Sequence, residues 1–114
     1  EAARWYRLAA EQGDVKAQCN LGIMFEHGQG VKKNEKEAML WYRLAAEQGL
    51  AQAQCKLGIM FEHGRGVGKN DKEAARWYRL AAKQGLAQAQ CKLGIMFEHG
   101  RGVAKNDMEA ARWY

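Results

Sequence analysis

Cysteine, glutamate and histidine are the side chains in this sequence that could bind a metal ion or react, and copies of each recur every 36 residues. These copies are Cys19, Cys55, Cys91, Glu26, Glu62, Glu98, His27, His63 and His99. Within one copy Cys55 and His63 are eight residues apart, which is about 12 Å along a helix. Zinc needs its ligand atoms about 2.0–2.3 Å from one ion. One helix therefore cannot supply both ligands, and the pattern favours a partly buried thiol over a metal site.

The sequence lacks the residues on which common catalytic sites depend. It contains no serine or threonine. This excludes hydrolases built on a hydroxyl nucleophile and any complete phosphate loop of the type G-x-x-x-x-G-K-S/T. The three histidines stand at equivalent places with no nucleophile beside them, which suits a repeated structural role. We therefore predict a protein that is not an enzyme and that binds no cofactor.

Composition and charge narrow the classes of partner. Of the 114 residues 47% are hydrophobic, which excludes an intrinsically disordered composition. No apolar run approaches the roughly 20 residues that cross a bilayer, so no membrane span is predicted. The net charge is +5, but residues 50–85 hold most of the excess, with seven basic and three acidic side chains. Because a nucleic-acid surface normally presents a sustained basic stripe, the sequence argues against nucleic acid as the partner.

The 36-residue interval indicates a stacked array of equivalent units. Residues 50–78 match residues 86–114 at 27 of 29 positions. A fixed period of this length is typical of arrays in which each unit buries its apolar face on the next. We predict one solenoid array in which residues 1–13 end a preceding unit, 14–49 and 50–85 are complete repeats, and 86–114 are a truncated third. The array is expected to be part of a longer one.

Each unit is predicted to form two helices. The first covers residues 50–63 in the middle unit, where Ala53, Leu57, Met60 and Phe61 share one face and Gly64 ends the helix. The second begins after an asparagine that can cap it and carries a glutamate three residues later. Those asparagines are Asn34, Asn70 and Asn106. The expected fold is all-α, a right-handed superhelical solenoid of antiparallel helix pairs.

Glycine and cysteine positions predict how the units touch. Glycine inside a helix costs about 1 kcal/mol relative to alanine, so its presence indicates close approach of a neighbouring helix. The positions concerned are Gly22, Gly58 and Gly94. Equivalent cysteines of adjacent units are expected about 10 Å apart, whereas a disulfide needs Cα atoms within about 7 Å. Three free thiols are therefore expected.

Two segments of the middle unit carry a family resemblance. Residues 53–67 read AQCKLGIMFEHGRGV, and residues 73–85 read EAARWYRLAAKQG. Together they resemble the Sel-one-like repeat, a tetratricopeptide-type α-solenoid, and the resemblance covers the whole chain. Two departures are visible: Lys32, Gly68 and Ala104 stand where the family usually has proline, and each unit has one cysteine where a tyrosine is common. The resemblance implies a non-enzymatic scaffold or adaptor for protein partners, and it points to the bacterial envelope or to secretion.

The resemblance also places a binding surface on the first helices. The positions opposite the predicted core match those that line the concave groove of tetratricopeptide-like repeats, so we expect a protein or peptide partner there. The predicted groove residues are Lys16, Cys19, Ile23, Glu26, His27, Gln52, Cys55, Ile59, Glu62, His63, Gln88, Cys91, Ile95, Glu98 and His99. In the competing interpretation cysteine and isoleucine pack between units, while glutamate and histidine are merely solvated.

The two ends of the sequence favour a second function. The chain begins and ends with the same six residues, EAARWY, and neither end shows the polar capping unit with which stable arrays finish. Uncapped ends could stack on other chains head to tail and propagate into a filament. The alternative to an adaptor is therefore a structural, self-assembling repeat protein that forms a fibre or a homo-oligomer.

Overall fold

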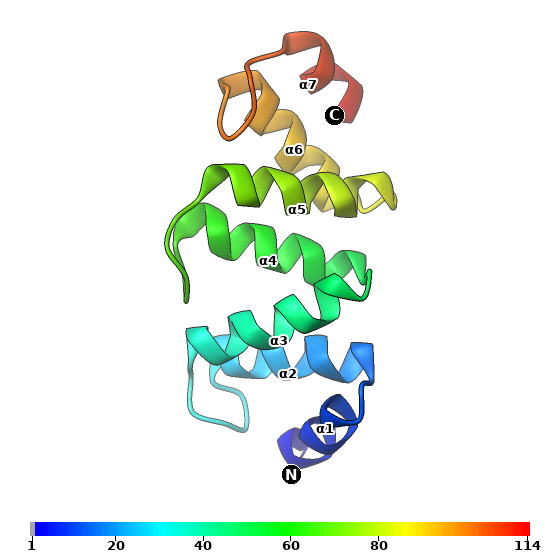
Figure 1. Cartoon of the computed structure of the whole chain (residues 1–114), viewed down its shortest axis with the longest axis vertical. Coiled ribbons are helices and arrows are strands. Elements are labelled where there is room, and N and C mark those ends of the chain that lie inside the picture. The colour runs from blue at the N-terminus through cyan, green and yellow to red at the C-terminus, as the bar shows by residue number, and fades with distance from the viewer. Residues whose placement is uncertain (1) are drawn as a thin grey trace.

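The computed structural model describes residues 2–114, and across that range the chain forms seven helices and no strand (Figure 1). The helices are α1 (Ala2–Glu11), α2 (Val15–His27), α3 (Glu35–Glu47), α4 (Ala51–His63), α5 (Asp71–Lys83), α6 (Ala87–His99) and α7 (Asp107–Trp113). We call α2, α4 and α6 the A helices, and α1, α3, α5 and α7 the B helices. They alternate along an elongated stack of 47 × 25 × 18 Å. The predicted all-α solenoid is confirmed. None of the described helices is long and apolar enough to cross a membrane.

The helix ends follow from the residues predicted to make them. The side-chain oxygens of Asn34, Asn70 and Asn106 each accept the backbone N–H three residues on, at 3.0–3.1 Å. Each satisfies a donor that the first turn of a helix leaves free. At the other end of α4, Gly64 adopts a left-handed conformation, with φ +65°, and its N–H donates to the Met60 carbonyl. These caps confirm the predicted starts of α3, α5 and α7 and the predicted end of α4.

The core is built from one face of each helix. The predicted core residues Ala53, Leu57, Met60 and Phe61 are all buried. Gly58 lies directly beneath Tyr78: a Cβ atom at Gly58 would lie 2.7 Å from the tyrosine ring. The absence of a side chain therefore lets α5 pack closely on α4, as the sequence predicts.

Buried polar side chains join each unit to the next. Gln54 in α4 donates to the carbonyl of Ala46, near the end of α3, at 3.2 Å. Its own oxygen accepts from Gln84, just after α5, at 3.0 Å. Gln18 makes the equivalent pair of contacts one unit earlier. These glutamines add a second donor to carbonyls near the helix ends and link them to the next helix, so the stack is held by directed contacts as well as by apolar burial.

Candidate binding surfaces

One narrow face of every A helix remains open to solvent. Its residues are spaced by four, three and four positions, which confines them to an arc of about 60° at 100° per residue. We call this surface the A-helix face. Its residues are Lys16, Asn20, Ile23 and His27 in α2, Gln52, Lys56, Ile59 and His63 in α4, and Gln88, Lys92, Ile95 and His99 in α6. All twelve are exposed or half-buried.

The structure separates the fifteen predicted groove residues into two groups. Eleven are exposed or half-buried: Lys16, Ile23, His27, Gln52, Ile59, His63, Gln88, Cys91, Ile95, Glu98 and His99. The other four, Cys19, Cys55, Glu26 and Glu62, are buried. For these four, the expectation of an open groove position is wrong, because a neighbouring unit and the partner B helix cover them.

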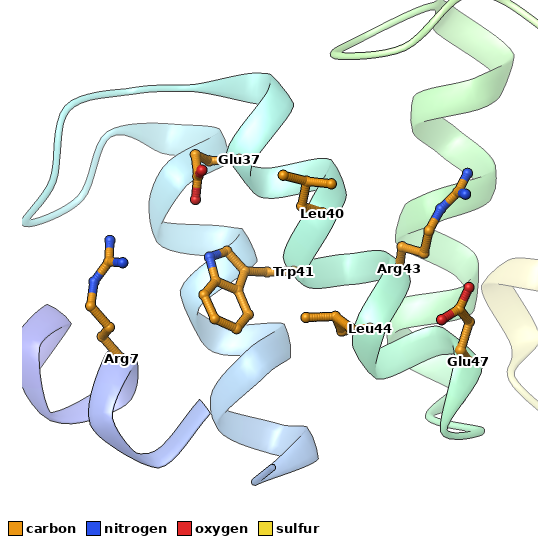
Figure 2. Close-up of a pocket in the computed structure, with 7 residues that line it drawn as sticks. All are labelled: Arg7, Glu37, Leu40, Trp41, Arg43, Leu44 and Glu47. Atoms are coloured by element: carbon orange, nitrogen blue, oxygen red, sulfur yellow. The ribbon is translucent and has the colours of Figure 1, made fainter. Parts of the chain in front are cut away.

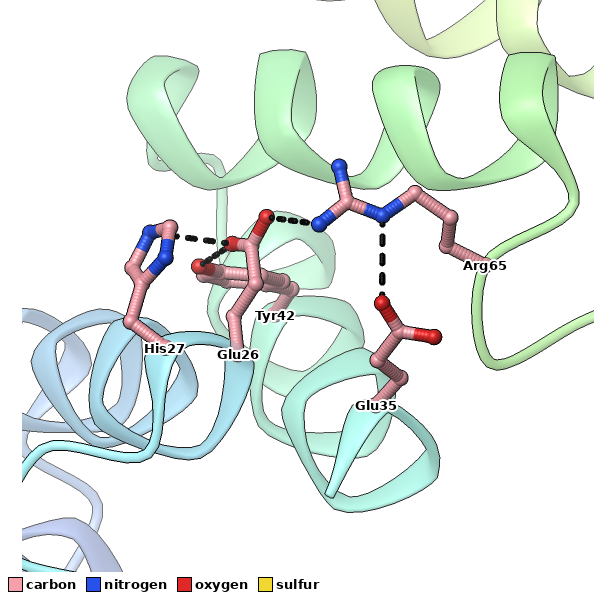
Figure 3. A network of polar contacts seen from close by, with 5 residues as sticks. All are labelled: Glu26, His27, Glu35, Tyr42 and Arg65. Atoms are coloured by element: carbon pink, nitrogen blue, oxygen red, sulfur yellow. Dashed lines mark hydrogen bonds and ion pairs between the residues drawn. The ribbon is translucent and has the colours of Figure 1, made fainter. Parts of the chain in front are cut away.

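The two buried glutamates belong to a polar network that crosses from one unit to the next (Figure 3). The Tyr42 hydroxyl donates to Oε1 of Glu26 at 2.6 Å. The guanidinium of Arg65, in the loop after α4, lies 3.1 Å from the second oxygen of Glu26 and 3.2 Å from Glu35. We call this arrangement the glutamate clamp. It ties an A helix, its B helix and the following unit together.

A second glutamate clamp repeats these contacts one unit later. Tyr78 donates to Glu62 at 2.6 Å, and Arg101 lies 3.2 Å from Glu62 and 3.6 Å from Asp71. Burial raises the pKa of the Tyr78 hydroxyl, and the hydrogen bond to Glu62 raises it further. Each carboxylate is thus neutralised inside the chain, which removes Glu26 and Glu62 from any surface a partner could touch.

Sequence reasoning missed three members of the A-helix face: Asn20, Lys56 and Lys92. The signal was present, because Lys56 lies one helical turn from both Gln52 and Ile59, which were assigned to the groove. Lys56 also lies close enough to Cys19, and Lys92 to Cys55, for their positive charges to lower the pKa of the two thiols. Burial outweighs this effect and raises the pKa of both cysteines.

The cysteines should therefore differ in reactivity. Cys91 is exposed, whereas Cys19 and Cys55 are buried with raised pKa values, and only the accessible thiolate attacks a disulfide reagent. We expect one thiol of the native chain to react with Ellman's reagent at least tenfold faster than the other two. All three should react together in denaturant. Cys91→Ala is expected to remove the fast phase alone, and three equal native rates would contradict the burial.

A hollow of about 440 Å³ lies on the opposite side of the stack, between α1 and α3 (Figure 2). Its lining residues are Arg7, Glu37, Leu40, Trp41, Arg43, Leu44 and Glu47. Its apolar character depends on Leu40, since Arg4, Arg76 and Arg112 occupy the equivalent positions. We call it the B-helix hollow. The leucine is confined to α3, whereas the isoleucine and the histidine of the A-helix face recur in every unit.

No group of three or more histidine, cysteine, aspartate or glutamate side chains within residues 2–114 is arranged to hold a metal ion. His27 illustrates why. Its Nε2 lies 3.9 Å from Glu26, and that carboxylate already accepts a hydrogen bond from Tyr42 and pairs with Arg65. The side chains that suggested metal chemistry are thus distributed between a structural network and the open surface.

Solved structures show what this chain is similar to. It superposes with a TM-score of 0.96 on c5321, a protective antigen present in uropathogenic Escherichia coli strains that displays an SLR fold, at 42% identity over 98% of this chain. A Sel1 repeat protein from Oxalobacter formigenes gives a TM-score of 0.93 at 46% identity, also over 98% of the chain. The chain spans 24% of the first protein and 46% of the second.

A more distant structure is cysteine rich protein B of Helicobacter pylori. It shares 25% identity, with a TM-score of 0.74, over 97% of this chain and 84% of that one. The comparison with curated proteins gave no match. The Sel1 repeat itself matches residues 1–14, 15–50, 51–86 and 87–114. The chain therefore belongs to the Sel1 repeat family, whose members are generally scaffolds for protein interactions and typically not enzymes.

Proposed function

We propose that this chain is a non-enzymatic scaffold that holds a protein or peptide partner along the A-helix face, with that face lining the concave side of the solenoid. The observation that carries the proposal is the row of half-buried isoleucines, Ile23, Ile59 and Ile95, each flanked by polar side chains on the same arc of its helix. Stacked units present such rows at regular spacing on rigid elements, which suits an extended partner. An aliphatic centre with a polar rim is also the usual composition of a protein interface.

The B-helix hollow is the competing location for the same function. It has depth and apolar walls, but one of its apolar lining residues, Leu40, is replaced by arginine in the other units. A partner held there would contact a single point of the array. The two locations can be separated by mutation, because the A-helix face and the hollow share no residue.

A selection without bias towards any ligand chemistry tests the proposal. Random peptides displayed on phage are selected on the full chain, and the binders are remeasured by fluorescence anisotropy. Ile23→Gln, Ile59→Gln and Ile95→Gln combined should weaken the selected binders at least tenfold, because glutamine keeps the helix and removes the aliphatic contact. Circular dichroism verifies that the triple variant is folded.

The matched control is Leu40→Arg, which places in α3 the residue that α5 has at Arg76. This change should leave the affinities unaltered. Binders that tolerate the triple variant and fail on Leu40→Arg would move the site to the B-helix hollow. Binders that tolerate both variants would overturn the proposed surface.

The second candidate function is structural: copies of the chain stack end to end and form a fibre. It is favoured by large apolar side chains exposed towards the two ends of the described stack, with Trp5 exposed by 68% and Met108 by 85%. Light scattering at two protein concentrations separates the candidates. A fibre former lengthens as concentration rises, whereas a scaffold of the first kind keeps a constant mass.

A further inference from the structure

We infer that the occupant of the A-helix face is an acidic peptide segment that also carries aliphatic side chains. This inference rests on the proposed function and names the partner's chemistry. It follows from what the glutamate clamps do to the charge of the surface and from the side-chain types that remain exposed.

The A-helix face is positively charged because two glutamates beside it are buried and paired with arginines. Its twelve residues include Lys16, Lys56 and Lys92, three histidines and no carboxylate. None of these lysines forms an ion pair within residues 2–114. The adjoining Glu26 and Glu62 could have balanced them, but both are buried and already paired with an arginine. The exposed Glu98 accepts the Tyr114 hydroxyl.

Charge of one sign along successive units selects a partner of the opposite sign. Lys56 and Lys92 occupy the same position in successive A helices, so their like charges repel one another weakly. A carboxylate placed between or above them relieves that repulsion and speeds the encounter. A basic partner would instead add to the repulsion.

The apolar part of the surface favours a peptide over a nucleic acid. The side chains set among the lysines and histidines are isoleucines, and aliphatic groups pack against aliphatic groups. Surfaces for single-stranded nucleic acids normally add aromatic side chains on which bases stack. The tryptophans here all lie on B helices: Trp5, Trp41, Trp77 and Trp113.

An extended peptide can present identical side chains to successive units. A polyproline II strand has three residues per turn and rises about 3.1 Å per residue, so every third side chain returns to the same side after about 9 Å. A glutamate at every third position therefore stands on one side of the strand, towards the lysines of successive units, with an aliphatic residue beside each.

The direct test uses a fluorescein-labelled peptide made of four repeats of Glu-Leu-Gln. Two controls replace its glutamates by lysine or by glutamine. By anisotropy at low salt, the glutamate peptide should bind at least tenfold tighter than either control, and its affinity should fall steeply as salt is added. Equal binding of the glutamine peptide would overturn the inference.

Mutation assigns the binding to the surface. Lys56→Gln with Lys92→Gln should weaken the glutamate peptide at least tenfold. The matched control, Lys72→Gln with Lys83→Gln, removes the same charge from exposed positions of α5 and should change the affinity less than twofold. Equal losses in both pairs would mean that net charge alone attracts the peptide, and would overturn the inference.

Two further outcomes are decisive. A labelled single-stranded oligonucleotide could bind more tightly than the glutamate peptide and depend on Lys56 and Lys92. That result would mean that the partner is a nucleic acid and not a peptide. The phage selection separates this inference from the function on which it rests. If neutral or basic peptides are selected and lose affinity on the isoleucine triple variant, the scaffold function stands and the acidic partner is refuted.

Discussion

Replacing Gly66 with alanine is expected to lower the free energy of unfolding by about 3 kcal/mol, because the residue sits where two units touch. Its φ is +74°, a conformation that costs an L-residue about 1–2 kcal/mol. A Cβ atom at this position would lie 2.3 Å from the backbone carbonyl oxygen of Glu35, in the preceding unit. Relieving that clash requires the loop to move away from α3, and forced repacking of this kind costs about 1–3 kcal/mol.

The chain contains its own control for this prediction. Gly30 occupies the equivalent position one unit earlier with φ +72°, and the nearest atoms to a Cβ there are side-chain atoms of Met24 and Ala3, at 3.2 and 3.7 Å. Gly30→Ala should therefore cost only the conformational part, about 1–2 kcal/mol. Urea unfolding followed by circular dichroism gives both values, and equal losses would contradict the role of the contact between units.

Gly66→Ala should also broaden the unfolding transition. In a repeat array each unit is stabilised largely by its neighbour, so a weakened junction lets the two sides unfold with less cooperation. The Gly30 variant leaves the junction between the first and second units intact. A reduced denaturant dependence confined to the Gly66 variant would distinguish loss of coupling from simple loss of stability.

The helices and their core were predictable because both are local and repeated. The capping asparagines, the apolar arc around Leu57 and the terminating glycine are each visible within one helix. The 36-residue period also predicts that the units stack. The apolar face of a helix, such as the one that carries Ala53 and Phe61, cannot be buried by that helix alone. The interior Gly58 was informative for the same reason: its cost to the helix predicted the close packing against α5.

The surface was harder to predict, because burial of a side chain depends on residues far along the chain. A helical wheel places Glu62 opposite the core of its own helix. It does not show that Tyr78, sixteen residues later, and Arg101, in the next unit, both reach that carboxylate. The exposure of Lys56 could be predicted without such knowledge, because Lys56 lies on the same arc of its helix as Ile59.

Replacing Glu62 with leucine is expected to cost about 3 kcal/mol, even though leucine fills a similar space with an apolar group. The change leaves the buried Tyr78 hydroxyl without its acceptor, and an unpaired buried donor costs about 1–3 kcal/mol. It also removes one of two carboxylates that hold Arg101, leaving Asp71 alone. The Arg101 side chain is 36% exposed and its guanidinium can turn to water, so most of the loss falls on the tyrosine.

A double-mutant cycle with Tyr78→Phe isolates the part of the free-energy loss that comes from the tyrosine hydroxyl. Phenylalanine keeps the ring against Gly58 and removes the hydroxyl, so the double variant contains no orphaned donor. Its loss should be smaller than the sum of the two single losses by about 1–2 kcal/mol. Strict additivity in urea unfolding would contradict the hydrogen bond as a source of stability.

Glu98→Leu is the matched control, because the same residue type accepts from the equivalent tyrosine in an exposed setting. Tyr114 is 61% exposed and Glu98 is exposed as well, so water can replace the lost hydrogen bond and the cost should be much smaller than at Glu62. A large loss at Glu62 beside a small one at Glu98 would mean that the glutamate stabilises the chain through its buried hydrogen bond to the tyrosine. The repeated glutamate would then belong to the framework, and recognition would fall to the lysines, isoleucines and histidines beside it.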